Sequence, residues 1–192
     1  MIDMPCVILS GGKSSRMQQD KSLMPFDKYP SLIEYQYKKL ISIFSSVYIS
    51  SKNNKFDDFF PSANLILDTG TTYSPMIALE SILKKFEQKI FIITVDTPFV
   101  SQKTMRNLVQ HSQGFAITLA KSGDRVHNLC GVFESSLLEP VRECLQKDIH
   151  KIGDLQKIAT SNIVSFDNHD EFININTRED YQRAIMLYIP LQ

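Results

Sequence analysis

Short apolar runs alternate along this chain with longer segments in which apolar residues recur at helical spacing. The most continuous apolar run covers residues 90–95, a pattern typical of a strand buried on both faces of a parallel sheet. Further strands are expected at residues 7–9, 47–49, 65–67, 115–119, 128–133 and 163–166. A turn at 122–124, Ser-Gly-Asp, lies between the strands that precede and follow it.

Helices are predicted between these runs. A helix is expected over residues 31–43, where Ile33, Tyr37, Leu40 and Ile41, together with the following Phe44, recur at the spacing of one helical face. Ser74 and Pro75 begin a second helix, with serine as the N-cap and proline at the first helical position. Ser101 caps a third helix, and residues 137–145 form a fourth. Residues 177–180 match a capping box that starts a last helix, which runs to about residue 187.

Strands that alternate with helices predict an α/β fold, a three-layer α/β/α sandwich around a mainly parallel, Rossmann-like sheet. The length of 192 residues suits a single domain, residues 1–192. Ligands of such sheets bind at the carboxyl ends of the strands. Residues that directly follow strands are therefore the first candidates for chemistry.

Composition narrows the function classes. A formal net charge of zero argues against a general binder of nucleic acid or of membrane surfaces. No apolar run approaches the roughly 20 residues of a membrane span, and we expect no secretory signal at the start. The three cysteines have no metal-binding spacing and cannot all pair, which favours a reducing, cytoplasmic setting.

The first predicted strand leads into Ser10-Gly11-Gly12-Lys13-Ser14-Ser15-Arg16-Met17, followed by Asp20-Lys21. Backbone N–H groups at a turn without bulky side chains, together with lysine and arginine, can cradle phosphate. The glycine spacing fits neither a Walker loop nor a dinucleotide fingerprint. By itself the pattern leaves a second interpretation open, a tight turn between strand and helix.

Two carboxylates follow predicted strands. Asp96 comes directly after the apolar run at 90–95, and Asp68 ends the short strand at 65–67. Mg²⁺ is typically held by one or two carboxylates together with substrate phosphates. Asp96 is therefore a candidate Mg²⁺ ligand, and the alternative is a carboxylate that only caps the turn before Pro98.

The stretch Leu-Ser-Gly-Gly-Lys-Ser-Ser-Arg-Met-x-x-Asp-Lys at 9–21 resembles the signature loop of the GT-A-like nucleotidyltransferases. It is most similar to the molybdenum cofactor guanylyltransferases (MobA-type), whose pattern is roughly L-A-G-G-x-S-x-R-M-G-x-D-K. Asp96-Thr97-Pro98-Phe99 and residues 172–177, Phe-Ile-Asn-Ile-Asn-Thr, match further elements of that family. The resemblance implies a GT-A-like fold and transfer of GMP from GTP to molybdopterin or Mo-molybdopterin, with release of pyrophosphate.

The resemblance also implies roles for individual residues. Arg16, Lys21 and Asp96 would be catalytic, and Asp96 would hold Mg²⁺. The nucleotide would be bound by Leu9, Ser10, Gly11, Gly12, Lys21, Asp68 and Asp96, while Asn174 and Asn176 would bind the pterin. Without the resemblance, Lys21 would be read as a solvated surface charge and the asparagines as turn and helix-capping residues.

Several positions depart from the family pattern. Ser74 and Ala78 stand where glycines are expected, Gln18 replaces a glycine, and Ser50 replaces a nucleotide-contacting asparagine. Two alternatives therefore stay open: a nucleotidyltransferase that uses CTP or acts on a sugar- or alditol-phosphate, and a cofactor-binding protein without catalysis. Expected partners are GTP, molybdopterin and other proteins of molybdenum cofactor biosynthesis. We expect a monomer or weak oligomer.

Overall fold

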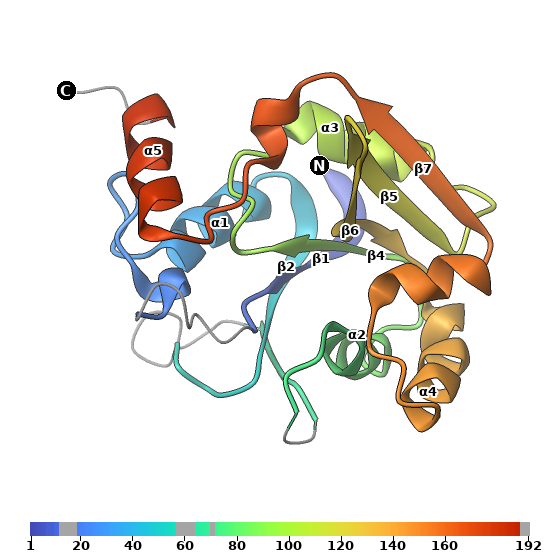
Figure 1. The fold of residues 1–192 in the computed structure, drawn as a ribbon. Coiled ribbons are helices and arrows are strands. Elements are labelled where there is room, and N and C mark those ends of the chain that lie inside the picture. Colours follow the sequence, from blue (N-terminus) through green and yellow to red (C-terminus); the bar gives the residue numbers. More distant parts are fainter. Residues whose placement is uncertain (12–18, 57–63, 70–71, 189–192) are drawn as a thin grey trace.

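The computed structural model describes residues 1–11, 19–56, 64–69 and 72–188 (Figure 1). Seven strands in these ranges form one sheet with the order β3-β2-β1-β4-β6-β5-β7. Their bounds are β1 Ile2–Leu9, β2 Phe44–Ser51, β3 Asn64–Leu67, β4 Ile90–Thr94, β5 Ile117–Ser122, β6 Arg125–Phe133 and β7 Ser161–Phe166. Every pairing is parallel except those that β6 makes with β4 and β5.

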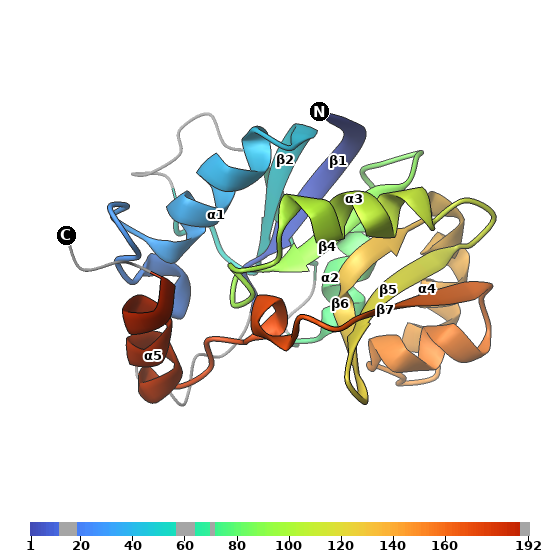
Figure 2. The same cartoon turned by 90° about the horizontal axis from the view of Figure 1, so that it is seen from above.

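Helices cover both faces of this sheet (Figures 1 and 2). Their bounds are α1 Leu32–Ile41, α2 Pro75–Leu83, α3 Gln102–Gln110, α4 Leu138–Gln146 and α5 Arg178–Tyr188. The apolar residues of α1 and α3 belong to the core on one face, and those of α2 and α4 belong to the core on the other. The predicted three-layer, mainly parallel α/β fold is therefore confirmed. Within the described ranges, no helix has the length and apolar character needed to cross a bilayer.

Local sequence explains where the helices start. The hydroxyl groups of Ser31, Ser74 and Ser101 each accept a hydrogen bond from a backbone N–H in the first turn of the helix that follows. At α5, the Thr177 hydroxyl accepts from Asp180 N, and the Asp180 carboxylate accepts from Thr177 N in return. The caps predicted at Ser74 and Ser101 and the predicted capping box are thus present, and Ser31 adds a further cap, since these side chains satisfy N–H groups that lack helical partners.

Several predicted segments differ from the observed ones at their ends, and two of them show why. The helix expected to reach residue 43 ends at Ile41, which is 40% exposed, and Phe44 instead starts β2 and packs against Phe91. The strand expected at 115–119 runs from Ile117 to Ser122, because the hairpin to β6 closes only at Gly123, whose φ of +56° suits glycine. Tertiary pairing extended the strands beyond their apolar stretches in both cases.

The sheet brings the candidate residues to one edge. Leu9, the last residue of β1, is paired with Ser50 of β2 and with Thr94 of β4. Ser10, Asp68 and Asp96 follow the carboxyl ends of β1, β3 and β4, three parallel strands. Parallel alignment therefore places both carboxylates and Ser10 on the same side of the molecule.

Candidate active site

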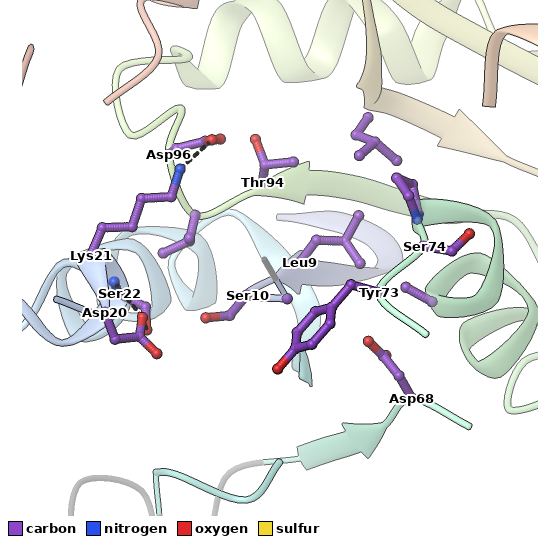
Figure 3. Close-up of a pocket in the computed structure, with 15 residues that line it drawn as sticks. Leu9, Ser10, Asp20, Lys21, Ser22, Asp68, Tyr73, Ser74, Thr94 and Asp96 are labelled. Carbon is purple, nitrogen blue, oxygen red and sulfur yellow. Dashed lines mark hydrogen bonds and ion pairs between the residues drawn. The ribbon is translucent and has the colours of Figure 1, made fainter. Parts of the chain in front are cut away.

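A cavity of about 310 Å³ lies at the carboxyl ends of β1, β3 and β4 (Figure 3). Its volume lies at the lower end of the range typical of small-molecule sites. It is lined by Leu9, Ser10, Gly11, Asp20, Lys21, Ser22, Asp68, Tyr73, Ser74, Pro75, Ala78, Thr94, Val95, Asp96 and Leu129. Six of the ten residues predicted to be catalytic or to bind ligands line this cavity: Leu9, Ser10, Gly11, Lys21, Asp68 and Asp96.

An ion pair stands on one side of this cavity. Lys21 Nζ is 2.7 Å from Asp96 Oδ2, and both side chains are 17% exposed (Figure 3). The same ammonium group donates to the carbonyl of Ile175 at 3.2 Å and to Asn176 Oδ1 at 3.1 Å. These three oxygens fix the position of the ammonium group at the cavity wall, unlike that of a lysine that extends freely into solvent.

The second carboxylate oxygen of Asp96 decides whether a metal ion fits. Asp96 Oδ1 is buried and has no hydrogen-bond partner among the described residues. The same part of the chain contains no group of three or more His, Cys, Asp or Glu side chains that could hold a metal by themselves. One available carboxylate oxygen suits Mg²⁺, because this ion commonly takes its remaining ligands from substrate phosphates and water.

Asp68 lies across the cavity from the Lys21–Asp96 pair, next to Gly11 (Figure 3). Its Oδ1 accepts a 2.7 Å hydrogen bond from the hydroxyl of Ser50, which is fully buried. Burial raises the pKa of Asp68 above its ordinary value, against the opposing effects of the Ser50 hydrogen bond and the Lys52 charge. A Cβ at Gly11 would come within 3.3 Å of Asp68 Oδ2, so glycine permits this close approach. Ser50, a departure from the family pattern, thus orients a candidate ligand-binding carboxylate.

A second hollow of about 400 Å³ adjoins the first and shares Thr94, Asp96 and Leu129 with it. Asn174 and Asn176 line this second hollow and not the first. Asn174 donates to the carbonyl of Phe172, and Asn176 accepts from Lys21, so the two asparagines differ in their surroundings. Asp96 lines both hollows, whereas Lys21 lines only the first and donates to Asn176 of the second.

Two predicted residues, Gly12 and Arg16, lie outside the described residues. Sequence reasoning missed Lys55, whose ammonium group contacts Asp20 and the carbonyl of Ser10. It also missed Tyr73, which lines the cavity. A lysine in a polar stretch has no sequence pattern that marks it as functional. Lys55 is 45 positions from Ser10 and 35 from Asp20 in sequence, so only the fold shows these contacts.

The start of α2 differs from a glycine-rich helix entry. The Ser74 hydroxyl caps the helix and also lies 2.9 Å from His150 Nδ1, while His150 Nε2 lies 3.0 Å from Asp148. Ser74 and Ala78 both line the cavity. These side chains occupy positions where two glycines would leave the helix backbone bare, so this wall of the cavity carries side chains.

His127 of β6 lines the second hollow. Its ring stacks on Phe172 with centroids 4.5 Å apart, and its Nε2 is 2.8 Å from the Ser122 hydroxyl. Burial, and to a smaller extent the Arg125 charge, lowers the pKa of His127 to about 4. The ring is therefore neutral near pH 7 and presents an uncharged surface to any ligand there.

This low pKa predicts a pH dependence of stability. An unfolded histidine binds a proton below about pH 6.5 whereas folded His127 does not until about pH 4, so the folded state loses stability as pH falls through this window. The full shift corresponds to about 3 kcal/mol. We expect His127→Gln to remove this loss. Urea unfolding of both proteins between pH 4 and 7.5 measures it, and a pH-independent difference in unfolding free energy would contradict the prediction.

Comparison with known proteins places this site in a family. Residues 6–161 match the MobA-like NTP transferase domain. A molybdenum cofactor guanylyltransferase of Campylobacter jejuni subsp. doylei is 40% identical over 94% of this chain and 95% of its own length. A protein of the same name from Helicobacter pylori strain J99 is 35% identical over 96% of this chain and 90% of its own length.

A solved structure shows the same fold. The molybdopterin-guanine dinucleotide biosynthesis protein A of Archaeoglobus fulgidus superposes with a TM-score of 0.79 and is 22% identical. The superposition covers 94% of this chain and 96% of the other. The family match over most of the sequence, together with relatives similar along nearly their whole lengths, identifies a nucleotidyltransferase: the chain belongs to the family of MobA-like NTP transferase domains.

Proposed function

We propose that this chain transfers GMP from GTP to the terminal phosphate of molybdopterin and releases pyrophosphate. The names of the Campylobacter and Helicobacter relatives support this reaction. The observation that carries the proposal is that Asp96 lines both hollows and is paired with Lys21, which lines the first. A donor nucleotide in one hollow and an acceptor in the other would meet at these two charged groups.

Within this proposal, GTP, the donor, binds in the first cavity, which has the larger number of lining residues. The backbone of residues 9–11 and the carboxylate of Asp68 hold the base and ribose of GTP. Lys21 and the amides of Gly11 and Gly12 contact its phosphates, and Arg16 lies between the phosphates of donor and acceptor. Asn174 and Asn176 bind the pterin part of the acceptor in the second hollow. Residues 1–192 act as one transferase domain, which is supported by the single sheet that β1 and β7 share.

This reaction needs no protein nucleophile, and the protein contributes mainly by positioning the two reactants. An acceptor phosphate oxygen forms a bond to the α-phosphorus of GTP, the bond from that phosphorus to the bridging oxygen breaks, and pyrophosphate leaves. A phosphate monoester is already ionised near neutral pH, so no side chain has to remove a proton first. Lys21 neutralises charge on the phosphates, and the enclosed cavity aligns the two reactants.

We propose Mg²⁺ as the divalent ion, held by Asp96, whose Oδ1 has no other partner among the described residues. When bound, this ion supplies positive charge that stabilises the pyrophosphate leaving group. The protein contributes the carboxylate, and the ammonium of Lys21 lies on its other oxygen.

A panel of triphosphates with and without Mg²⁺ tests the donor. We expect GTP with Mg²⁺ to raise the melting temperature by about 5–10 °C at 100 times its Kd, and ATP, UTP and CTP to raise it less, because binding to the folded state alone stabilises it. Release of pyrophosphate from GTP should then require molybdopterin.

The alternatives make different predictions in the same experiment. A larger shift with CTP would show a cytidylyltransferase, and turnover with a sugar- or alditol-phosphate would show a different acceptor. A shift without pyrophosphate release would show a binding protein that lacks catalysis. Any of these outcomes would contradict the proposed reaction.

A further inference from the structure

Lys55 joins two parts of the chain that flank the cavity. It follows β2, and its ammonium group forms an ion pair with the Asp20 carboxylate and donates to the carbonyl of Ser10 at 3.2 Å. Ser10 and Asp20 stand on either side of residues 11–19, and both line the cavity. The Lys55 side chain is 23% exposed and that of Asp20 is 34% exposed, so the pair is partly shielded from water.

The contacts continue from Asp20 to Lys21. Asp20 caps the short 3₁₀ helix Lys21–Leu23, because its Oδ1 accepts from Ser22 N at 3.0 Å and from the Ser22 hydroxyl at 2.6 Å. Ser22 is buried, which fixes the turn from which Lys21 reaches Asp96 (Figure 3). The position of the Lys21 ammonium therefore depends on a carboxylate that Lys55 holds.

Charge gives Lys55 a second effect. Burial alone would raise the pKa of Asp20, but hydrogen bonds from Lys55 and Ser22 outweigh it and hold the pKa below its ordinary value. Asp20 is thus an anion on the wall of the cavity. Without the neighbouring ammonium group, its negative charge would repel a triphosphate in that cavity.

We propose that Lys55 is a positioning residue for the donor nucleotide, which fastens Ser10 to Asp20, orients the turn that carries Lys21, and neutralises Asp20. It acts through these groups and does not contact the reacting atoms. The inference rests on the proposed function only in taking the ligand of this cavity to be a nucleoside triphosphate. This role accounts for the contacts of Lys55 with Ser10 and Asp20, two residues far from it in sequence.

The test compares Lys55→Met with Lys55→Arg and with a matched control, Lys89→Met. Lys89 is 24% exposed and donates to the carbonyls of Ser112 and Phe115, with Glu134 4.0 Å away. It precedes β4, at the opposite end of that strand from Asp96. Removing Lys89 thus deletes a similarly buried charge and similar hydrogen bonds without affecting the cavity.

We expect Lys55→Met to lower kcat/KM for GTP at least tenfold, mainly through KM, and to reduce the nucleotide-induced rise in melting temperature. Lys55→Arg should stay within about threefold of wild type, because arginine can also donate to a carboxylate and a carbonyl. Lys89→Met should keep both the kinetics and the nucleotide response, even if its melting temperature without nucleotide falls.

A double-mutant cycle with Asp20→Asn tests whether Lys55 acts through Asp20. If Lys55 acts through Asp20, the double variant should be less impaired than the product of the two single effects, since the unpaired charge has gone. Wild-type kcat/KM in Lys55→Met, equal losses in Lys55→Met and Lys89→Met, or multiplicative effects in the cycle would each overturn the proposal.

The triphosphate preference of the wild-type protein distinguishes a failure of this proposal from a failure of the proposed function. If it prefers a triphosphate other than GTP, guanylyl transfer fails, and the same variants are compared with the preferred triphosphate by thermal shift. A wild-type protein that responds to no triphosphate would overturn both.

Discussion

Asp96→Asn is expected to lower the rate of pyrophosphate release by at least two orders of magnitude while the protein stays folded. The carboxylate pairs with Lys21, and its buried Oδ1 is the oxygen available for a cation. An amide of the same size keeps the packing but loses the negative charge, and electrostatic groups at reacting phosphates contribute effects of this size.

The measurement is turnover of GTP and molybdopterin at several Mg²⁺ concentrations, with the melting temperature recorded for each variant. Asp3→Asn is the matched control, because Asp3 is an exposed residue of β1 near the end of that strand opposite the cavity. Its turnover should equal that of the wild type. An Asp96→Asn protein that retained more than a tenth of the wild-type rate would exclude the proposed role of this carboxylate.

Gly131→Ala is expected to destabilise the protein by about 3 kcal/mol or more, through overpacking of the sheet. Gly131 of β6 pairs with Ile92 of β4 and Leu119 of β5. A Cβ at this position would lie 2.0 Å from the carbonyl oxygen of Thr118 and 3.0 Å from Leu119 Cα. Both are backbone atoms of a central strand, so relief requires the sheet itself to shift.

Thermal unfolding measures this effect, and a loss of about 3 kcal/mol corresponds to a decrease of roughly 6–12 °C in a protein of this size. Gly153→Ala is the control, since the nearest atom to its Cβ would be 3.8 Å away, an ordinary contact. It should melt within about 2 °C of wild type. A similarly small change for Gly131→Ala would mean that β5 and β6 yield more easily than their pairing indicates.

The fold was predictable from the sequence because its signals are local. The apolar run at β4 and the serine caps each specify an element without reference to distant residues. Strand ends were less predictable. β1 begins at Ile2 and contains Pro5, where its register with β2 shifts, and proline in a strand usually argues against pairing.

The sequence predicted which residues line the candidate site better than it predicted the contacts between them. Residues that follow strand ends converge in any parallel sheet, which is why Ser10, Asp68 and Asp96 meet in one cavity. The ion pair between Lys21 and Asp96, which are 75 positions apart, could be identified only from the folded structure. The contact of Lys55 with Asp20 and the hydrogen bond from Ser50 to Asp68 were hidden for the same reason.

Lys21 is held partly by residues that follow it by more than 150 positions, through the carbonyl of Ile175 and the side chain of Asn176. Ile175 N in turn donates to the carbonyl of Asp96. Proteins are synthesised from the N-terminus, and early segments can begin to fold before later ones exist. A growing polypeptide of this sequence therefore cannot assemble a complete site until residues 175 and 176 have left the ribosome, and a product terminated before them would lack these supports.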